Sequence, residues 1–135
     1  MIIFSLNLRG IGGPSKISSL KHLLALVKLD MIFFQETLVD GEKAKKFFLQ
    51  CCPLWNCVAL DPNGRSSGLQ SGWNPSSADL CVYGTTVGIL LEGKIKDISR
   101  SVKFLNFYAP YKDRVFLETP GRLWFSERGK FNYGR

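Results

Sequence analysis

The sequence predicts an α/β domain, and two observations carry this prediction. Near the N-terminus, residues 2–35 read as an apolar strand, a helix and a second apolar strand in succession. Between residues 55 and 108, short strand-like segments alternate with turns. Strands that alternate with helices are typical of α/β folds. Because 135 residues are enough for roughly one domain, we expect residues 1–135 to form a single domain.

The first strand is predicted over residues 2–8, which are mostly apolar and are followed by three glycines within residues 10–13. A helix then begins near Pro14, and its apolar residues recur with the period of one buried helix face. These residues are Ile17, Leu20, Leu24 and Val27. Residues 31–35 are almost wholly apolar, as expected for a strand covered on both faces. Strand, helix and strand in this order predict a parallel βαβ unit.

A second helix is predicted over residues 42–51, where Ala44, Phe47 and Phe48 share one face and three lysines line the other. The rest of the chain predicts short strands at 55–60, 69–73, 80–83, 87–92 and 102–108. We expect these five segments to form an antiparallel meander.

Composition and charge exclude several classes of protein. No stretch of the sequence reaches the ~20 consecutive apolar residues of a membrane span, and the first apolar run lacks the pattern of a signal peptide. The four cysteines have neither the spacing of a zinc site nor the density of a disulfide scaffold, so we expect free thiols. A soluble intracellular protein is predicted. A net charge of +7 favours a polyanionic partner such as DNA or another nucleic acid.

Two polar residues follow the two predicted parallel strands. Asn7 stands at the end of the first, and Glu36 directly follows the second. Open α/β sheets bind ligands at the carboxyl ends of their strands, and neighbouring strands lie ~4.8 Å apart. The amide and the carboxylate are therefore expected to converge on one cation, and a hard ion such as Mg²⁺ is held by this kind of oxygen ligand. Taken by itself, Glu36 also fits a helix cap or a surface position.

Five short motifs occur in one order along the chain. They are NLRG at 7–10, FQET at 34–37, RSSGL at 65–69, GWNP at 72–75 and NFYAP at 106–110. This series resembles the endonuclease/exonuclease/phosphatase family, and most of all the apurinic-type endonuclease domain of LINE-type retroelements. The resemblance covers about residues 1–115.

The resemblance implies a four-layer α/β sandwich that hydrolyses phosphodiester bonds with Mg²⁺ or Mn²⁺. In 135 residues we expect this sandwich to be incomplete, with a mixed sheet and flanking helices. By resemblance, Glu36 is the metal-binding glutamate, Asn7 helps to order the metal site, and Tyr108 lies near the scissile phosphate. Arg9 stands where DNA-repair members of the family carry an acid, which points to the retroelement branch. Action on DNA would place the protein in the nucleus.

The C-terminal part departs from the family pattern. The family continues with a Gly-Asp-Phe-Asn segment and ends with Ser-Asp-His. Here the first is matched only by GKFN at 129–132, so that Asn132 would bind phosphate while Lys130 replaces the acid. The Ser-Asp-His segment has no counterpart in this sequence. The only histidine of the chain, His22, lies in the first predicted helix, where we expect a solvated or packing role and no part in catalysis. Since catalytic groups act as a unit, we expect weak or no nuclease activity from this chain.

Two other interpretations remain open. In the first, the chain is a noncatalytic module that binds nucleic acid through lysines and arginines. In the second, it is a nonfunctional fragment derived from a retroelement. The basic residues of the first are Lys43, Lys45, Lys46, Lys94, Lys96, Arg100, Lys103, Lys112 and Arg114. Phosphate binding by such residues weakens steeply with salt and needs no divalent metal.

Overall fold

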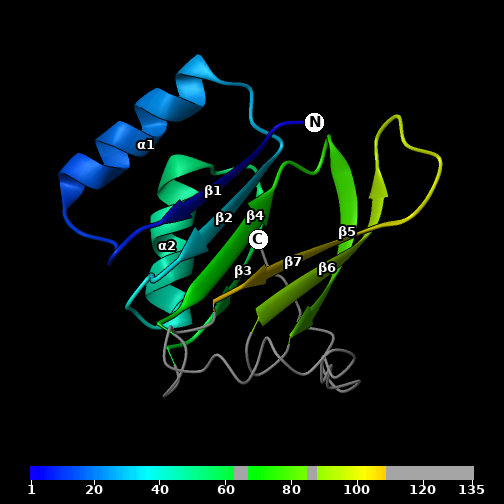
Figure 1. The fold of residues 1–135 in the computed structure, drawn as a ribbon. Coiled ribbons are helices and arrows are strands. Elements are labelled where there is room, and N and C mark those ends of the chain that lie inside the picture. Colours follow the sequence, from blue (N-terminus) through cyan, green and yellow to red (C-terminus); the bar gives the residue numbers. More distant parts are fainter. Residues whose placement is uncertain (63–66, 85–87, 109–135) are drawn as a thin grey trace.

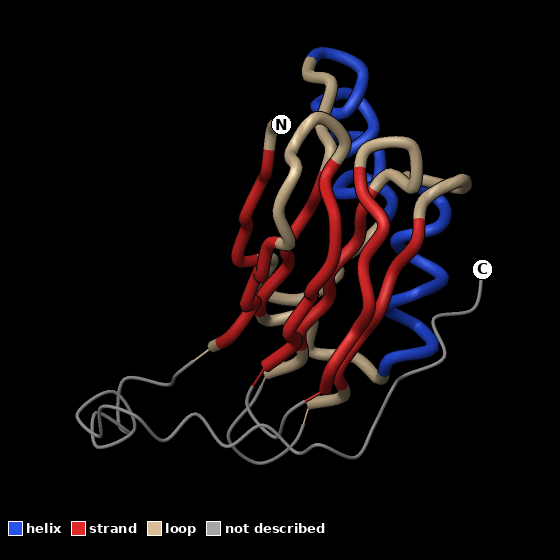
Figure 2. The backbone as a smooth tube through the Cα atoms, turned by 90° about the vertical axis from the view of Figure 1, so that its right-hand side faces the viewer, coloured by secondary structure: helices blue, strands red, loops and turns tan. Residues whose placement is uncertain are grey.

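The computed structural model describes residues 1–62, 67–84 and 88–108. Within them, two helices, a four-stranded sheet and a three-stranded sheet lie in three successive layers (Figure 1). Both helices lie on the side of the four-stranded sheet that faces away from the other sheet, as the turned view of Figure 2 also shows. The predicted α/β class is confirmed, and these are three of the four layers expected of the sandwich.

The first sheet is built on the predicted parallel pair. Strand β1 (Ile3–Asn7) leads through helix α1 (Pro14–Leu26) to strand β2 (Met31–Gln35), and β1 and β2 pair in parallel. Strand β4 (Leu69–Trp73) pairs antiparallel with β2 on its other side, and β3 (Asn56–Leu60) pairs with β4. The order is therefore β1-β2-β4-β3, which makes the sheet mixed, as expected.

The helix layer follows from the apolar faces of the two helices. Pro14 occupies the start of α1, where its missing N–H costs nothing. Helix α2 (Gly41–Cys51) begins after Asp40, whose carboxylate accepts a hydrogen bond from the Lys43 N–H at 3.0 Å. Its buried residues are Ala44, Phe47 and Phe48, as predicted. The ring of Phe48 lies so close to Gly72 of β4 that any side chain there would collide with it.

The second sheet corrects one prediction. The strands after residue 55 do not form one meander, because β3 and β4 join the first sheet. Only β5 (Ala78–Gly84), β6 (Gly88–Ile95) and β7 (Val102–Phe107) form an antiparallel meander, in a sheet of their own. The division occurs at the turn after β4, where Asn74 accepts hydrogen bonds from the backbone N–H groups of Ser76, Ser77 and Ala78 and the chain crosses between sheets.

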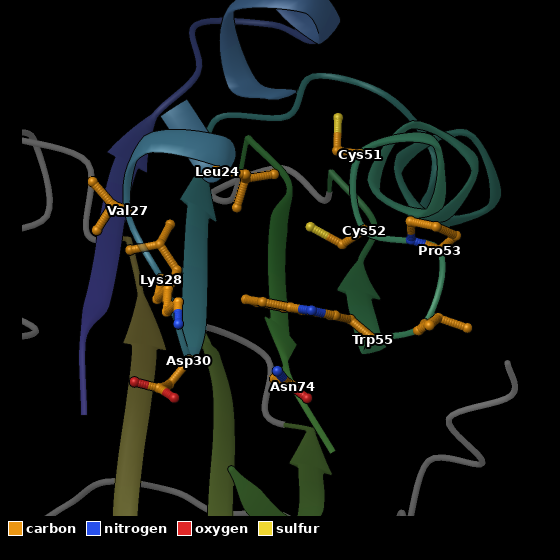
Figure 3. Close-up of a pocket in the computed structure, with 11 residues that line it drawn as sticks. Leu24, Val27, Lys28, Asp30, Cys51, Cys52, Pro53, Trp55 and Asn74 are labelled. Carbon is orange, nitrogen blue, oxygen red and sulfur yellow. The ribbon is translucent and has the colours of Figure 1, made fainter. Parts of the chain in front are cut away.

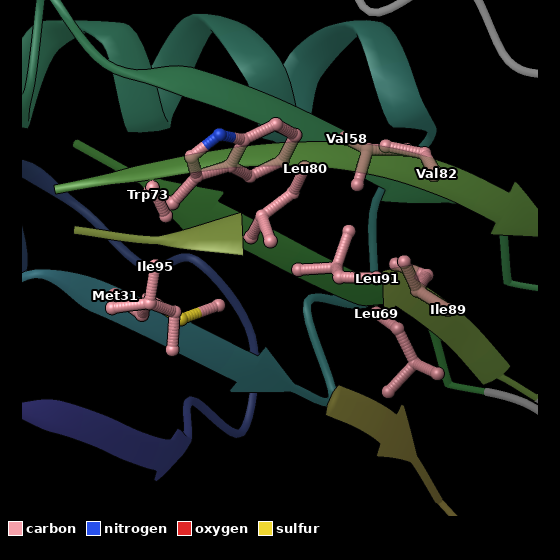
Figure 4. Close-up of a cluster of buried hydrophobic side chains, with 10 residues drawn as sticks. Met31, Val58, Leu69, Trp73, Leu80, Val82, Ile89, Leu91 and Ile95 are labelled. Atoms are coloured by element: carbon pink, nitrogen blue, oxygen red, sulfur yellow. The ribbon is translucent and has the colours of Figure 1, made fainter. Parts of the chain in front are cut away.

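The main core lies between the two sheets (Figure 4). Met31, Leu69 and Trp73 of the first sheet pack against Leu80 and Leu91 of the second, and all five are at most 1% exposed. Alternate residues of β2 serve the two cores, since Met31 faces the second sheet whereas Ile32 and Phe34 face the helices. This burial on both faces explains why residues 31–35 are apolar throughout.

In the described part of the chain, neither helix is long and apolar enough to cross a membrane. All four cysteines are free thiols, as expected.

Candidate active site

The two polar residues singled out by the sequence meet at one edge of the first sheet. Asn7 is the register partner of Gln35, so Glu36 lies one residue beyond the end of the paired strands. The pairing continues past the strands, because the Leu8 N–H donates to the Gln35 carbonyl at 2.8 Å and the Gly10 N–H to the Glu36 carbonyl at 2.7 Å. The prediction that Asn7 and Glu36 end neighbouring strands is confirmed.

Three residues near this edge adopt a left-handed backbone conformation that side chains disfavour. Arg9, Glu36 and Leu38 have φ angles of 50°, 52° and 58°. Such conformations cost of order 1 kcal/mol or more each and cluster at functional sites. Glu36 directly follows the last residue of β2, so its left-handed conformation ends the strand at the edge of the sheet.

The Glu36 carboxylate accepts hydrogen bonds from the side chains of Asn7 and Tyr108. These two bonds lower the pKa of Glu36 below its ordinary value, and the bond from Asn7 has the largest effect. The positive charge of Arg9 lowers this pKa further. In return, the hydrogen bond to Glu36 and the negative charge of its carboxylate raise the pKa of the Tyr108 phenol. Glu36 is therefore an anion at neutral pH, and its side chain is partly exposed to solvent.

The amide of Asn7 is held from both ends. Its Oδ1 accepts a hydrogen bond from the Arg9 N–H at 3.0 Å, while its NH₂ group donates to Glu36. A carbonyl oxygen has two lone pairs, so Oδ1 retains one acceptor position. Glu36 and Asn7 thus offer carboxylate and amide oxygens of the kind that suits Mg²⁺, which takes one or two protein carboxylates and completes its shell with water and phosphate.

A lysine stabilises the turn that follows β1. The ammonium of Lys16, at the start of α1, donates to the carbonyls of Leu8 and Gly10, at 2.6 Å to Leu8. The turn that carries Arg9 is therefore fixed to the helix. This role was not predicted, although Lys16 follows the first motif closely in the sequence.

The segment at 67–69 lies directly beside the turn after Glu36. The Thr37 N–H donates to the Gly68 carbonyl at 3.2 Å, and the Leu38 N–H donates to the Ser67 carbonyl at 2.8 Å. Gly68 has a φ of +89°, and a Cβ atom on it would lie 2.2 Å from the Thr37 Oγ1. Backbone hydrogen bonds of Ser67 and Gly68, the described residues at the centre of the RSSGL motif, therefore support the turn that follows Glu36.

Two residues before Tyr108, a buried asparagine joins the second sheet to the first. The side chain of Asn106, only 2% exposed, accepts a hydrogen bond from the Gln35 Nε2 at 2.8 Å. Its own NH₂ group donates to the Phe34 and Gln70 carbonyls at 3.3 and 3.0 Å. Sequence reasoning gave Asn106 no role of its own. The available signal was a polar residue that shares a strand face with Tyr108.

Asn132 and the GKFN segment lie outside the described residues. His22 is exposed on α1. Within residues 1–62, 67–84 and 88–108, no three or more His, Cys, Asp or Glu side chains gather into a group that could hold a metal ion. Among these residues, Glu36 is the acid that the site offers.

A pocket of about 460 Å³ lies at the opposite end of β2 (Figure 3). Its lining is largely apolar, with Leu24, Val27 and Trp55. The carboxylate of Asp30 at its edge already accepts hydrogen bonds from Ser77 Oγ and the Ile2 N–H, each at 2.6 Å. This pocket brings together no set of groups for catalysis.

Comparison with known proteins agrees with the architecture described above. The structure is similar to the crystal structure of an AP endonuclease from Leishmania major, with a TM-score of 0.59 over 78% of this chain. The described residues have an α/β fold like that of the matched part of this AP endonuclease. Sequence identity to that protein is 15%, and the matched region spans only 39% of its length. No protein-family model and no curated protein matches the chain. The AP endonuclease fold agrees with the architecture that the sequence motifs predicted.

Proposed function

We propose that Asn7, Glu36 and Tyr108 form the metal-binding corner of a phosphodiester-cleaving site of the endonuclease/exonuclease/phosphatase type. The ancestral activity was the nicking of target DNA by a LINE-type retroelement. The observation that carries this proposal is the Glu36 carboxylate, which is an anion at neutral pH, is partly exposed to solvent and is hydrogen-bonded by Asn7 and Tyr108. The AP endonuclease fold supports it, because these residues lie at the strand ends where α/β sheets bind ligands.

In this proposal Glu36 binds Mg²⁺ or Mn²⁺ through its carboxylate. The bound ion would polarise a phosphoryl oxygen and stabilise the leaving oxygen. Asn7 orients the carboxylate through its NH₂ group and has one lone pair of Oδ1 left for the ion. Tyr108 donates to Glu36 and places a phenol beside the position of the phosphate. Arg9 adds a positive charge that favours an anionic substrate.

We expect this site to have weak or no nuclease activity in the present chain. Hydrolysis requires a base for the attacking water as well as a metal, and Lys130 stands where the family has the aspartate that handles this water. A protonated lysine cannot accept a proton and repels a cation. Asn132, in the same segment, is proposed to contact phosphate.

Metal binding and nicking test the proposal separately. Binding of Mn²⁺, followed by electron paramagnetic resonance, should be lost in Glu36→Ala and kept in Glu42→Ala, which removes another acid from the first turn of α2. Equal binding by the wild type and Glu36→Ala would refute a metal site. Nicking of supercoiled plasmid with Mg²⁺ should be weak or absent. Strong nicking that requires Glu36 would contradict the predicted lack of nuclease activity.

The alternative, a basic module that binds nucleic acid through phosphates, has less support from the fold. Lys43 and Lys46 belong to the helix layer, whereas Lys94 and Lys103 lie on the second sheet, at the opposite side of the sandwich (Figure 1). Lys103 also pairs with Glu92 at 3.5 Å. A binding module predicts affinity for DNA that falls steeply with salt and is unchanged in Glu36→Ala.

A further inference from the structure

The side chain of Asn106 connects the two sheets next to the candidate site. It belongs to β7 of the second sheet, yet its side-chain hydrogen bonds are made to residues of the first sheet. Its Oδ1 accepts from Gln35 of β2. Its Nδ2 donates to the Phe34 carbonyl of β2, and to the Gln70 carbonyl and Ser71 Oγ of β4, the last at 3.1 Å.

This arrangement gives both ends of a buried amide hydrogen-bond partners. An asparagine side chain has two N–H donors and one carbonyl acceptor, and here both ends have partners although the residue is only 2% exposed. Buried hydrogen bonds are strengthened by the low local dielectric, and leaving such a group without partners costs about 1–3 kcal/mol. Asn106 therefore strongly favours one position of β7 relative to β2.

The residues on both sides of this connection are neighbours of the site. Gln35, which donates to Asn106, is followed directly by Glu36. Asn106 stands two residues before Tyr108, so the two side chains lie on the same face of the extended chain. The connection thus lies one residue from the carboxylate and two residues from the phenol that donates to it.

We propose that Asn106 is a positioning residue, which fixes β7 against β2 so that the Tyr108 phenol meets the Glu36 carboxylate and orients it toward a cation. The part that concerns the cation rests on the proposed function. The part that concerns the pairing of Tyr108 with Glu36 holds for the protein without metal. Residues that orient a metal ligand through hydrogen bonds typically change metal affinity by about 10- to 100-fold when mutated.

The test compares three variants of the full chain. Asn106→Ser removes the connection itself. Gln35→Ala removes one partner at a half-buried position and serves if Asn106→Ser does not fold. Gln70→Leu is the matched control, because it deletes another buried side-chain bond of the first sheet, from Gln70 Nε2 to the Ala44 carbonyl of α2 at 2.9 Å. It keeps the backbone carbonyl of residue 70, which accepts from Asn106.

The first measurement is the nuclear Overhauser effect between the Tyr108 ring and the Glu36 side chain in metal-free protein. We expect it in the wild type and in Gln70→Leu, and we expect its loss in Asn106→Ser and Gln35→Ala. If it persists in a folded Asn106→Ser, or in Gln35→Ala when Asn106→Ser does not fold, the positioning role is refuted. If Gln70→Leu loses it as well, the effect is general loosening, and the role is again refuted.

The second measurement is the affinity for Mn²⁺, with paramagnetic broadening of the Tyr108 ring signals as the readout. Asn106→Ser should weaken binding about tenfold, whereas Gln70→Leu should change it less than about twofold. If the wild type shows no Mn²⁺ binding that depends on Glu36, the proposed function fails, and the metal-free measurement still decides the role of Asn106. Equal affinities in Asn106→Ser and wild type would refute its effect on the cation.

Discussion

The Tyr108 hydroxyl donates a hydrogen bond to the Glu36 carboxylate, although the two residues come from different sheets. The candidate site is therefore assembled across the interface between the sheets and does not belong to either one. The acid and its asparagine are brought together by the parallel pair β1 and β2. The phenol arrives only when the second sheet has packed against the first.

This pairing predicts linked titrations of the two residues. Tyr108→Phe removes a donor to the carboxylate, so the pKa of Glu36 should rise toward its ordinary value. Glu36→Gln removes the negative charge, so the pKa of Tyr108 should fall toward its ordinary value. Nuclear magnetic resonance titration of labelled Glu and Tyr side chains measures both. A Tyr108 pKa that does not respond to Glu36→Gln would contradict the contact.

Asp30 predicts a dependence of stability on pH. Hydrogen bonds from Ser77 and from the Ile2 N–H lower its pKa in the folded state. The stabilisation is therefore present above the unfolded pKa and is lost as pH falls through the folded pKa. Asp30→Asn should lower the free energy of unfolding by about 1–2 kcal/mol at neutral pH, as measured by urea denaturation, and by little at low pH.

A suitable control for this prediction is Asp79→Asn, because Asp79 is exposed on β5. Its effect should stay within about 0.5 kcal/mol. If Asp30→Asn lowered the free energy of unfolding by the same amount at every pH, the charge of Asp30 would not contribute to stability.

Gly68 predicts a large effect of a single methyl group. Its φ of +89° opposes a side chain, and so does the Thr37 Oγ1, which would lie 2.2 Å from the Cβ of an alanine at this position. Gly68→Ala should therefore destabilise the protein by more than about 1 kcal/mol, measured as a lower melting temperature. Gly13→Ala is the matched control, since nothing lies within 4 Å of its Cβ position. Equal melting temperatures for the two variants would contradict the close approach.

The cysteines predict an order of chemical modification. Cys81 is exposed, whereas Cys52 and Cys57 are 5% and 1% exposed. Burial also raises the pKa of Cys52 to about 12, which leaves very little reactive thiolate. An aromatic disulfide reagent should modify Cys81 first in the native protein and reach Cys52 and Cys57 only on unfolding. Loss of the fast phase of modification in Cys81→Ser would show that this phase is the reaction of Cys81.

Much of the first sheet and of the site was predictable because the signals were local. The apolar run at 31–35 predicted a strand buried on both faces, and the helical period after Pro14 predicted the crossover. Two strands joined by a helix have to be parallel, so their carboxyl ends meet at one edge. The convergence of Asn7 and Glu36 followed from this connectivity and from no other information.

The division of the later strands between two sheets was not predictable from their pattern. Alternation of apolar and polar residues identifies a strand but not its partner, so β3 and β4 were indistinguishable from the strands of the meander. Their assignment depends on long-range contacts, such as that of Phe48 with Gly72. The role of Asn106 was hidden for the same reason, because its partners Phe34 and Gln70 lie 72 and 36 residues away.

Strand β7 pairs with β6 and with no other described strand, and its side chains point alternately into the sandwich and out of it. Loss or gain of one residue inside β7 would exchange these two sides for every residue that follows. Asn106 or Tyr108 would then face solvent, and the acid at position 36 would lose its partner while the composition of the chain barely changed. The hairpin between Ile95 and Val102 lies outside this ladder, so changes of length there leave the parity of the strand intact.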